Sequence, residues 1–357
     1  MDTTLDRLAD HLRARADAAP TVALLQPAEP FLDTVGEAMR RRLFVTEDGA
    51  GTPMCLRPEF TIPLCLHHIA SDALVGTSYA GVGTVFRQGQ HPREFPQAGI
   101  EYVGHMNAAK TDADALRAML DALAVAGVRA PAVTLGDKAL FTALLRSLDL
   151  TAGWRERLVR AFGDPDALDL LLAELASPPA GPPETEEERW AVEGDEERLV
   201  ARVSELMHAG GLSPTAGRRP EVVARRAIER ARDARARLDP FALHILRSFL
   251  ALDQPLADAL ASLDTLGTQG AVDWDGTLDG LRARAQALDG LALRFRAGFG
   301  HPLDYYTGLL FEARPEDAAG SDPAVAVGGR YDGLCLALGA PAPVPAVGFT
   351  IAVDRVR

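Results

Sequence analysis

Hydrophobic residues recur at helical spacing in the first segment of the chain. The positions concerned are Leu5, Leu8, Leu12 and Ala16. Residues three or four apart share one face of an α-helix, and Pro20 marks where this pattern ends. The same reasoning predicts a helix over residues 33–42 and another over residues 111–126, the second ending at Gly127.

Strand-like segments fall into two blocks. The first block holds residues 43–66, where the turn residues suggest a hairpin, and residues 76–87, 99–104 and 131–137; the second holds residues 293–295, 305–313, 324–328 and 346–353. Between them the pattern is almost entirely helical, with a Pro-rich, acidic linker candidate at 177–188. Strands, helices and strands again predict an antiparallel-rich α+β fold in which both blocks share one sheet. We therefore expect a core of residues 1–137 and 289–357, interrupted by a mostly helical insertion at 138–288.

Length and composition narrow the class of protein. A chain of 357 residues suggests about two domains, and its 47% hydrophobic and 24% charged residues are typical of a globular protein. The apolar runs fall far short of the ~20 residues that a membrane span needs. The N-terminus is polar and acidic, unlike a secretory signal. These features predict a cytoplasmic protein with no membrane partner.

Charge and metal-binding residue types exclude several kinds of site. A net charge of −13 disfavours electrostatic capture of nucleic acid, so a protein or small molecule is the expected partner. The widely spaced Cys55, Cys65 and Cys335 argue against a disulfide framework and against a structural zinc site, and we expect buried thiols. The eight histidines show no metal-ligand spacing, so neither metal nor cofactor is expected.

Six short motifs occur in the order found in histidyl-tRNA synthetases. They cover residues 56–61, 85–87, 95–101, 303–306, 328–334 and 345–349. Each motif is weak alone, but the ordered set means that the chain resembles this family. The resemblance implies a class II aminoacyl-tRNA synthetase-like core, with an antiparallel sheet flanked by helices, and a pocket for histidine.

A pocket for free histidine must pair every polar group of the ligand. Burying an ammonium, a carboxylate or a ring nitrogen without a partner costs several kcal/mol. The resemblance implies that Glu59 and Thr61 hold the ammonium, Arg87 the carboxylate, Gln97 and Glu101 the amino-acid body and ring side, and Tyr305, Tyr306 and Tyr331 the imidazole. These eight residues form the predicted histidine-binding site.

Residue spacing supports only part of that site. Gln97 and Glu101 are four positions apart, so an extended strand places both on one face, and the same argument applies to Glu59 and Thr61. Isolated Glu and Gln side chains on half-exposed strands are usually solvated, and this alternative stays open. Adjacent tyrosines at 305 and 306 cannot both face one side of a strand, which leaves core packing for one of them. The glycine-rich residues 328–333 are expected to form a turn.

Three departures from the synthetases weaken the case for an enzyme. His301 and Pro302 stand where the family has an Arg-Gly pair, and a neutral histidine cannot replace a permanently charged, forked guanidinium on a reacting phosphate. The loop between Arg87 and Phe95 is shorter than the loop that covers ATP, and the sequence ends without room for an anticodon-binding domain. Arg355 matches an ATP-binding arginine of the family, which leaves nucleotide binding open.

With these departures, the chain is similar to the regulatory subunits of ATP phosphoribosyltransferase, which are synthetase-like paralogues. Residues 25–31, 41–44 and 60–65 add to this resemblance. It implies a chain with no catalytic residue, which supports the short-form catalytic subunit at the first step of histidine biosynthesis and takes L-histidine as its inhibitory effector. It also implies a homodimer within a hetero-octamer.

Two alternative functions and one local alternative stay open. The chain could be a divergent ligase that still activates histidine, or a scaffold that binds no amino acid. The arginine-rich residues 218–237 have mixed charges at helical spacing and are expected to form a solvated helix, with a tRNA-binding patch as the alternative.

Overall fold

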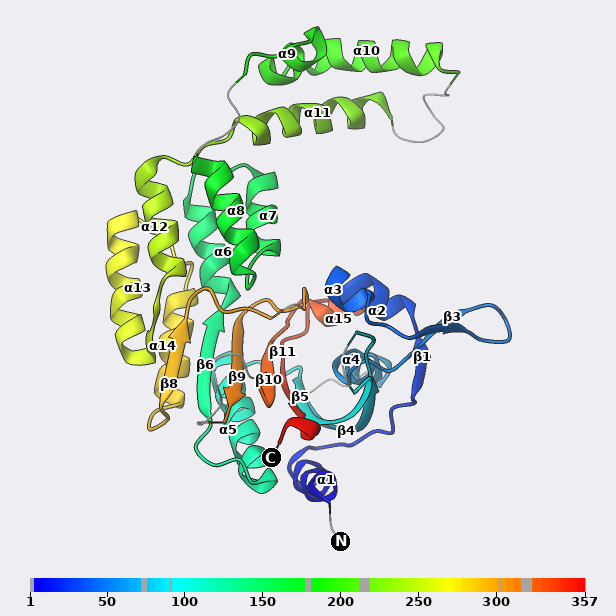
Figure 1. The fold of residues 1–357 in the computed structure, drawn as a ribbon, viewed down its shortest axis with the longest axis vertical. Helices are drawn as coiled ribbons and strands as arrows, with labels where there is room; N and C mark the ends of the chain where they lie inside the picture. The colour runs from blue at the N-terminus through cyan, green and yellow to red at the C-terminus, as the bar shows by residue number, and fades with distance from the viewer. Residues whose placement is uncertain are drawn as a thin grey trace.

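The computed structural model describes residues 3–71, 76–89, 92–176, 181–211, 219–301, 303–315 and 323–356. Its centre is an eight-stranded sheet with the order β4-β5-β11-β10-β9-β6-β8-β7 (Figure 1). The strands are β4 (Thr77–Phe86), β5 (Glu94–Val103), β6 (Ala132–Asp137), β7 (Asp253–Pro255), β8 (Leu293–Arg296), β9 (Leu309–Arg314), β10 (Ala326–Arg330) and β11 (Ala346–Ala352). Neighbouring strands are antiparallel except for the parallel pair β6 and β8. The predicted α+β class is confirmed.

The two blocks of strands share this sheet, as predicted. They join on both sides of β6, which pairs with β9 and with β8, and again where β5 pairs with β11, from Ala346 opposite Val103 to Ala352 opposite Gln97. The strands approach closely there because Gly99 has no side chain. A Cβ atom on Gly99 would lie 1.9 Å from the carbonyl oxygen of Phe349.

The two longer predicted helices of the first block are confirmed, and both cover the sheet. Helix α1 (Thr4–Arg15) begins with a capping box between Thr3 and Asp6, and it buries Leu8 and Leu12. Helix α5 (Ala108–Ala126) packs across β5, β10 and β11. It ends at Gly127, whose φ of 98° is left-handed.

The helix predicted over residues 33–42 is two shorter helices. They are α2 (Glu29–Thr34) and α3 (Gly36–Arg40). The break lies at Gly36, whose φ of 75° a continuous right-handed helix cannot contain. The side-chain pattern alone does not reveal such a break, because the apolar positions keep helical spacing across it.

The hairpin predicted within residues 43–66 is confirmed in part. Strands β2 (Val45–Glu47) and β3 (Pro53–Leu56) pair with each other, and β1 (Leu25–Pro27) pairs with β3 in the same small sheet. The end of the segment is instead helix α4 (Thr61–Ala70), which buries Ile62, Leu64 and Cys65. A short apolar run fits a buried helix as well as a buried strand, which explains the difference.

The stretch between the two blocks is mostly helical. It contains α6 (Lys138–Ser147), α7 (Ala152–Arg160), α8 (Pro165–Ala176), α9 (Glu186–Glu193), α10 (Glu196–Ala209), α11 (Pro220–Arg235), α12 (Pro240–Leu250), α13 (Leu256–Gly270) and α14 (Thr277–Ala287). Helices α6 and α12–α14 contribute buried residues to the main core, including Phe141, Leu246 and Leu281. The same stretch supplies β7 to the sheet. The domain division at residues 137 and 289 stays a prediction.

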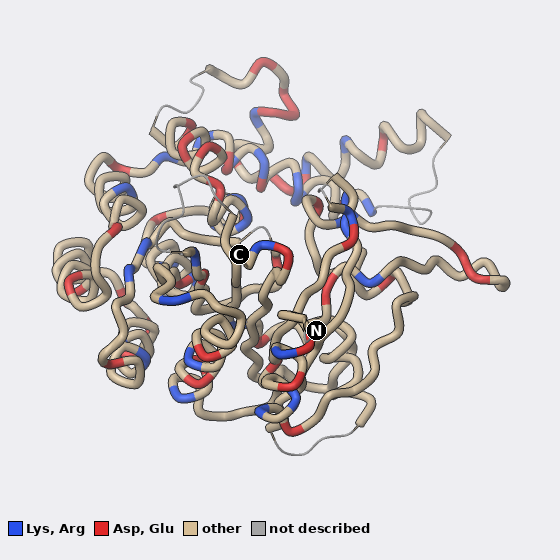
Figure 2. The backbone as a smooth tube through the Cα atoms, turned by 60° about the horizontal axis from the view of Figure 1, so that its bottom comes forward, with Lys and Arg blue, Asp and Glu red and all other residues tan. Residues whose placement is uncertain are grey.

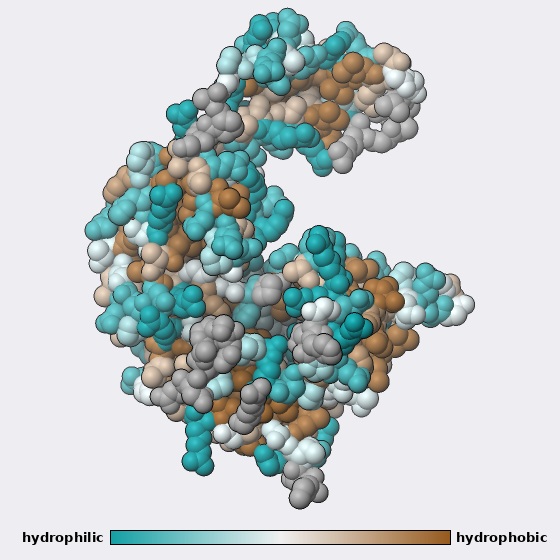
Figure 3. Space-filling view, viewed as in Figure 1, coloured by the Kyte–Doolittle hydropathy of each residue, from teal (hydrophilic) through white to brown (hydrophobic). Residues whose placement is uncertain are grey.

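Helices α9, α10 and α11 form a separate lobe. The lobe has its own small core of Ala191, Leu199, Ala224 and Ile228, and it stands at the top of Figure 1. Figure 3 shows an open hollow between the lobe and the body. The predicted linker partly overlaps this region: residues 177–180 lie outside the described residues, and α9 begins at Glu186.

The predicted solvated helix at 218–237 is α11, which belongs to this lobe. Acidic and basic residues are interspersed over the molecule (Figure 2), and Arg225 of α11 pairs with Glu196 at 2.8 Å. Residue 218 lies outside the described residues. The mixed-charge interpretation is therefore supported from Pro220 to Arg235.

The expected burial of the three cysteines is confirmed. Cys55, Cys65 and Cys335 are free thiols in the interior, and burial raises the pKa of Cys55 to about 11. Cys335 lies on the short helix α15 (Leu334–Ala337), and a 3-10 turn (Val353–Arg355) follows β11. In the described ranges, no helix is long and apolar enough to cross a membrane. The same ranges contain no group of three or more His, Cys, Asp or Glu residues suited to a metal ion.

Candidate ligand-binding site

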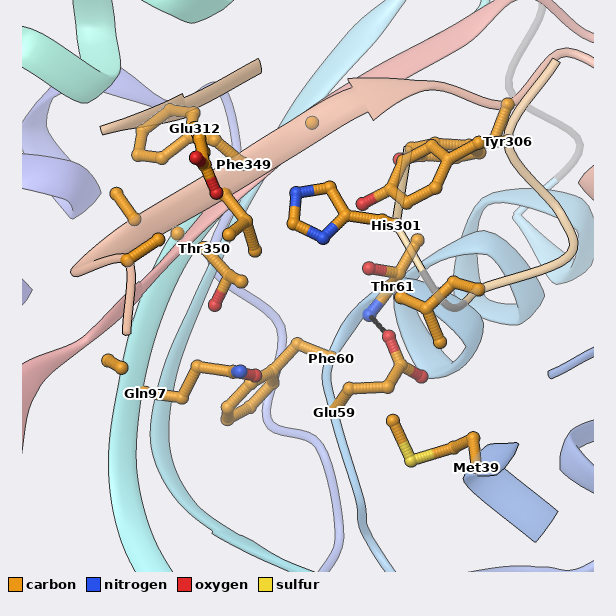
Figure 4. A pocket seen from close by; sticks show the side chains of 18 of the residues that line it. Met39, Glu59, Phe60, Thr61, Gln97, His301, Tyr306, Glu312, Phe349 and Thr350 are labelled. Atoms are coloured by element: carbon orange, nitrogen blue, oxygen red, sulfur yellow. Dashed lines mark hydrogen bonds between the residues drawn. The ribbon is translucent and has the colours of Figure 1, made fainter. Parts of the chain in front are cut away.

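One cavity brings together all eight residues of the predicted site. It has a volume of about 460 Å³ and is lined by Glu59, Thr61, Arg87, Gln97, Glu101, Tyr305, Tyr306 and Tyr331. Figure 4 shows side chains from both blocks of the chain converging on it. The solvated alternative does not apply to Glu59, Gln97 or Glu101, which are 4%, 3% and 5% exposed.

Glu59 lies directly before helix α4 and caps its first turn. Its carboxylate accepts a hydrogen bond from the backbone N–H of Thr61 at 2.5 Å (Figure 4) and another from that of Ile62 at 3.0 Å. The predicted strand through Glu59 and Thr61 is therefore wrong, because the helix begins at Thr61. Burial raises the pKa of Glu59, while these hydrogen bonds lower it.

Gln97 and Glu101 lie on strand β5, and the prediction that they share one face is confirmed by their common place in the cavity wall. Glu101 accepts a hydrogen bond from Thr61 Oγ1 at 2.6 Å and another from the hydroxyl of Tyr331. Burial raises the pKa of Glu101 to about 8, and Glu59 adds to the rise. Glu101 is thus largely a neutral acid at pH 7 in the ligand-free cavity.

Gly348 makes room for the Glu101 side chain, and sequence reasoning assigned it no role. It lies opposite Glu101 in the β5–β11 register, and a Cβ atom there would be 1.5 Å from Glu101 Oε2. The glycine stands in one of the six motifs, but its role depends on pairing with a strand almost 250 residues earlier. Only a glycine fits this position.

Tyr305 and Tyr306 both line the cavity, so the expectation that they face opposite sides is wrong. Strand β9 begins only at Leu309, and the two tyrosines lie in the turn before it. Their ring centroids are 4.9 Å apart, and Tyr305 makes an edge contact with Tyr331 at 5.7 Å. The strand rule of alternating faces does not apply within a turn.

Tyr331 follows directly after strand β10. The predicted turn at residues 328–333 is wrong for its first half, because Gly328, Gly329 and Arg330 pair with β9 or β11. A Cβ atom on Gly328 would lie 2.4 Å from the ring of Phe311, so packing between strands explains this glycine. The turn itself begins only after Tyr331.

Arg87 supplies positive charge to the cavity. Its Nε donates to the carbonyl oxygen of Pro58 at 2.9 Å. Burial lowers the pKa of Arg87, and the nearby Glu59 opposes this. Arg355 lines the same cavity and donates from Nη1 to the carbonyl oxygen of Ala324 at 3.0 Å.

His301 lies in the cavity wall close to the predicted site. Its ring contacts Phe299 edge-on at 5.3 Å and lies 6.1 Å from Tyr306, and Figure 4 shows it between Tyr306 and Glu312. Its buried Nε2 has no hydrogen-bond partner among the described residues. Burial lowers its pKa to about 4, so the ring is neutral at pH 7. Residue 302 lies outside the described residues.

The arrangement suits a small zwitterion that also has a polar ring. The eight residues of the predicted site contribute two buried carboxyl groups, a guanidinium, an amide and three tyrosines to a cavity of the size that small ligands occupy. Buried carboxyl groups without a full set of partners favour a cationic group of a ligand. The side chains therefore complement an amino acid better than an apolar molecule.

Comparisons with known proteins identify the family to which the chain is related. The sequence model of the histidyl-tRNA synthetase family matches residues 20–249 and 199–356. The chain is 46% identical to the ATP phosphoribosyltransferase regulatory subunits of Sinorhizobium medicae and of Rhizobium meliloti, each over 366 aligned positions that cover 99% of this chain and 95% of the relative.

Solved structures show the same fold. A Bacillus halodurans protein described as an ATP phosphoribosyltransferase regulatory subunit/histidyl-tRNA synthetase superposes with a TM-score of 0.66 at 19% identity, over 99% of this chain and 77% of that one. The histidyl-tRNA synthetase of Nostoc sp. PCC 7120 gives a TM-score of 0.63 at 14% identity, over 99% and 69%. The predicted class II synthetase-like fold is confirmed, and the chain belongs to the family of ATP phosphoribosyltransferase regulatory subunits.

Proposed function

We propose that this chain is a histidine-sensing, non-catalytic regulatory subunit of an ATP phosphoribosyltransferase. The observation that carries the proposal is the single cavity in which all eight predicted side chains meet. Membership of the family supports the regulatory part, and the chemistry of the cavity supports histidine as the effector.

In this proposal each end of the ligand meets a complementary wall. Glu59 and Thr61 hold the ammonium, and Arg87 holds the carboxylate. Gln97 and Glu101 contact the body and ring side, and the three tyrosines enclose the imidazole. Glu59 already accepts two backbone hydrogen bonds from α4, so part of its acceptor capacity remains for the ligand. The ligand and the first turn of α4, which also carries Thr61, would therefore share the Glu59 carboxylate as their acceptor.

His301 supports the non-catalytic part of the proposal. Amino-acid activation builds charge on a phosphate, and a fixed cation that stabilises this charge is worth several kcal/mol. His301 lines the cavity with a pKa of about 4, so it brings no charge at pH 7. It therefore cannot take the part of the synthetase arginine.

The proposed partner is a short-form catalytic subunit, which transfers a phosphoribosyl group to ATP. The regulatory chain supports the active state of this partner in the cytoplasm, as a homodimer within a hetero-octamer, without nucleic acid. Histidine shifts the assembly only if it binds the two states unequally, by about 1 to 3 kcal/mol.

Calorimetry with L-histidine tests the site. We expect saturable binding, and a large loss of affinity for analogues that lack the ring nitrogens, because their absence leaves buried polar groups unpaired. The matched control is Arg282→Gln, which changes an exposed arginine of α14. Absence of heat with L-histidine would leave a scaffold as the remaining interpretation.

Reconstitution tests the partner. A short-form catalytic subunit should gain activity on mixing with this chain, and L-histidine should lower that activity. If mixing changes nothing, the regulatory assignment is wrong even where histidine binds.

A histidine-activating ligase is the second candidate, favoured by one observation. Arg87 and Arg355 both line the cavity and could meet the phosphates of a nucleotide. Pyrophosphate exchange that depends on both histidine and ATP would establish this activity. We expect none, because the neutral His301 lacks the required charge.

A further inference from the structure

A buried ion network lies behind one wall of the cavity. Its centre is Asp112 of α5, whose side chain is 0% exposed. Asp112 accepts hydrogen bonds from Arg330 Nε at 2.9 Å and Nη2 at 2.5 Å, and from Arg284 Nε at 2.5 Å. One carboxylate is thus shared by two arginines, from β10 and from α14.

The Arg330 end of the network holds the aromatic wall of the cavity. Arg330 precedes Tyr331 and donates to Asp332 at 2.8 Å, so both sequence neighbours of that tyrosine belong to the network. Thr307, the residue after Tyr306, donates its N–H to the carbonyl oxygen of Arg330 at 2.8 Å. Thr307 Oγ1 also accepts from the N–H of Asp332 at 3.1 Å. The backbones that carry Tyr306 and Tyr331 are therefore tied together behind the cavity.

The Arg284 end belongs to the helical stretch between the two strand blocks. Arg284 lies on α14 with an 11% exposed side chain, and α14 packs against both α5 and α6. Asp137 caps the N-terminus of α6. Burial raises the pKa of its carboxyl group, and the charge of Arg284 opposes this rise in part. Arg284 thus connects three helices to a carboxylate that also holds the cavity wall.

Charge balance makes Arg284 more than a packing residue. Buried ionised groups are tolerated only when they are paired and hydrogen-bonded, and removal of one partner shifts the others. Among the ion pairs of the described residues, Asp112 without Arg284 keeps only Arg330 as a partner. We expect the carboxylate then to turn toward Arg330 and the backbone of Arg330 and Tyr331 to shift with it.

We propose that Arg284 is a positioning residue for the cavity: through Asp112 and Arg330 it holds the Tyr331 hydroxyl on Glu101, so that α14 sets the affinity of the site for histidine. The inference rests on the proposed function, because it assumes that histidine is the ligand. Coupling between sites is reciprocal, so bound histidine in turn stabilises the contact of α14 with the core. The helical stretch between the two strand blocks is thereby coupled to the occupancy of the cavity.

A double-mutant cycle tests the route. Arg284→Gln removes the charge, and we expect affinity for L-histidine to fall about 3- to 10-fold, the size of one misaligned hydrogen bond. In a Tyr331→Phe background, which already lacks the hydroxyl, the same change should alter affinity by less than about 1.5-fold. Arg284→Lys should restore most of the affinity, and Arg282→Gln on the exposed face of the same helix should change nothing.

The outcomes separate the inference from the function. If the unmodified chain binds no histidine, the proposed function fails. If it binds, but Arg284→Gln leaves affinity unchanged or acts with equal strength in both backgrounds, the inference alone is wrong.

Hydrogen exchange on the unmodified chain gives an answer that does not depend on folding of a variant. Saturating L-histidine should slow amide exchange in residues 277–287 of α14 as well as around the cavity. Slowing confined to β5, α4 and residues 303–334 would overturn the inference, since α14 would then not sense the ligand.

Discussion

Replacement of Glu101 by glutamine separates the charge of this residue from its shape. Glutamine keeps nearly the same volume, and its carbonyl oxygen accepts from one of the two hydroxyls of Thr61 and Tyr331 while its amide N–H donates to the other, but it cannot ionise. The ligand-free carboxyl has a pKa of about 8, because burial and the nearby Glu59 oppose its charge. Glu101→Gln therefore imitates the empty, protonated state of the cavity.

The size of the effect follows from this pKa. An opposite charge at contact distance lowers a carboxyl pKa by about 1 to 3 units. If a cationic group of histidine lowers the pKa of Glu101 from about 8 to between about 5 and 6, ionisation strengthens binding at pH 7 by about 10- to 100-fold. The variant loses this gain, so its affinity should be weaker by the same factor.

The same reasoning predicts a proton released on binding. At pH 7 a carboxyl with a pKa of about 8 is protonated in about nine molecules of ten, so each histidine should expel about 0.9 proton from Glu101. Between pH 7.0 and 7.5 the affinity of the unmodified chain should consequently rise about 2- to 3-fold more than that of Glu101→Gln. Titration of free histidine is common to both proteins and cancels.

Isothermal calorimetry in buffers of different ionisation enthalpy measures both quantities. The reasoning is refuted if Glu101→Gln binds histidine within twofold of the unmodified chain, or if both release the same number of protons. Either result would mean that Glu101 faces the ligand as a neutral acid or does not face it at all.

Three further predictions concern stability and packing. Between about pH 5 and 8, the free energy of unfolding of the ligand-free chain should fall with rising pH by about 1.4 kcal/mol per pH unit more than that of Glu101→Gln. The reason is that folded Glu101, with its raised pKa, keeps a proton that the unfolded chain has lost. Equal slopes in denaturant titrations of the two proteins would contradict this. Gly348→Ala should abolish histidine binding and cost about 1 to 3 kcal/mol of stability, since its Cβ would overlap the Glu101 carboxylate. The control is Gly49→Ala, whose Cβ would have nothing within 4 Å, and it should change neither the thermal unfolding nor the binding heat. Ile228→Ala should destabilise the lobe of α9–α11 by about 2 to 5 kcal/mol and speed its proteolysis, while histidine affinity stays within twofold; a parallel loss of affinity would show that lobe and cavity are coupled.

Sequence reasoning succeeded where one regular element carries the chemistry. Strand β5 presents Gln97 and Glu101 to one side because extended backbone alternates its faces, and residue spacing suffices for that. Sequence reasoning failed at two places where it assumed extended backbone. One is the start of helix α4, and the other is the turn before strand β9. An apolar run with β-favouring residues does not distinguish these local conformations, because tertiary packing decides between them.

Other features depend on contacts that no local pattern contains. The role of Gly348 follows from its register with Glu101. The lack of a partner for His301 Nε2 among the described residues follows from what surrounds it in the folded chain. The sharing of Asp112 by Arg284 and Arg330 joins it to positions 172 and 218 residues further along the chain. Resemblance to a family supplied the eight site residues, but not the network behind them.

Strand β11 sits in the middle of the large sheet, between β5 and β10, although it follows them in the chain. During synthesis, the residues of the wall with Glu101 emerge long before those of the wall with Tyr331, and in the sheet that the structure describes the two strands are joined through β11. Such distant pairing makes assembly slow, since a long stretch must be ordered before the contact is gained. Until then Glu101 stands at an open edge of the sheet, so the cavity has its complete wall only in chains whose two strand blocks have already paired.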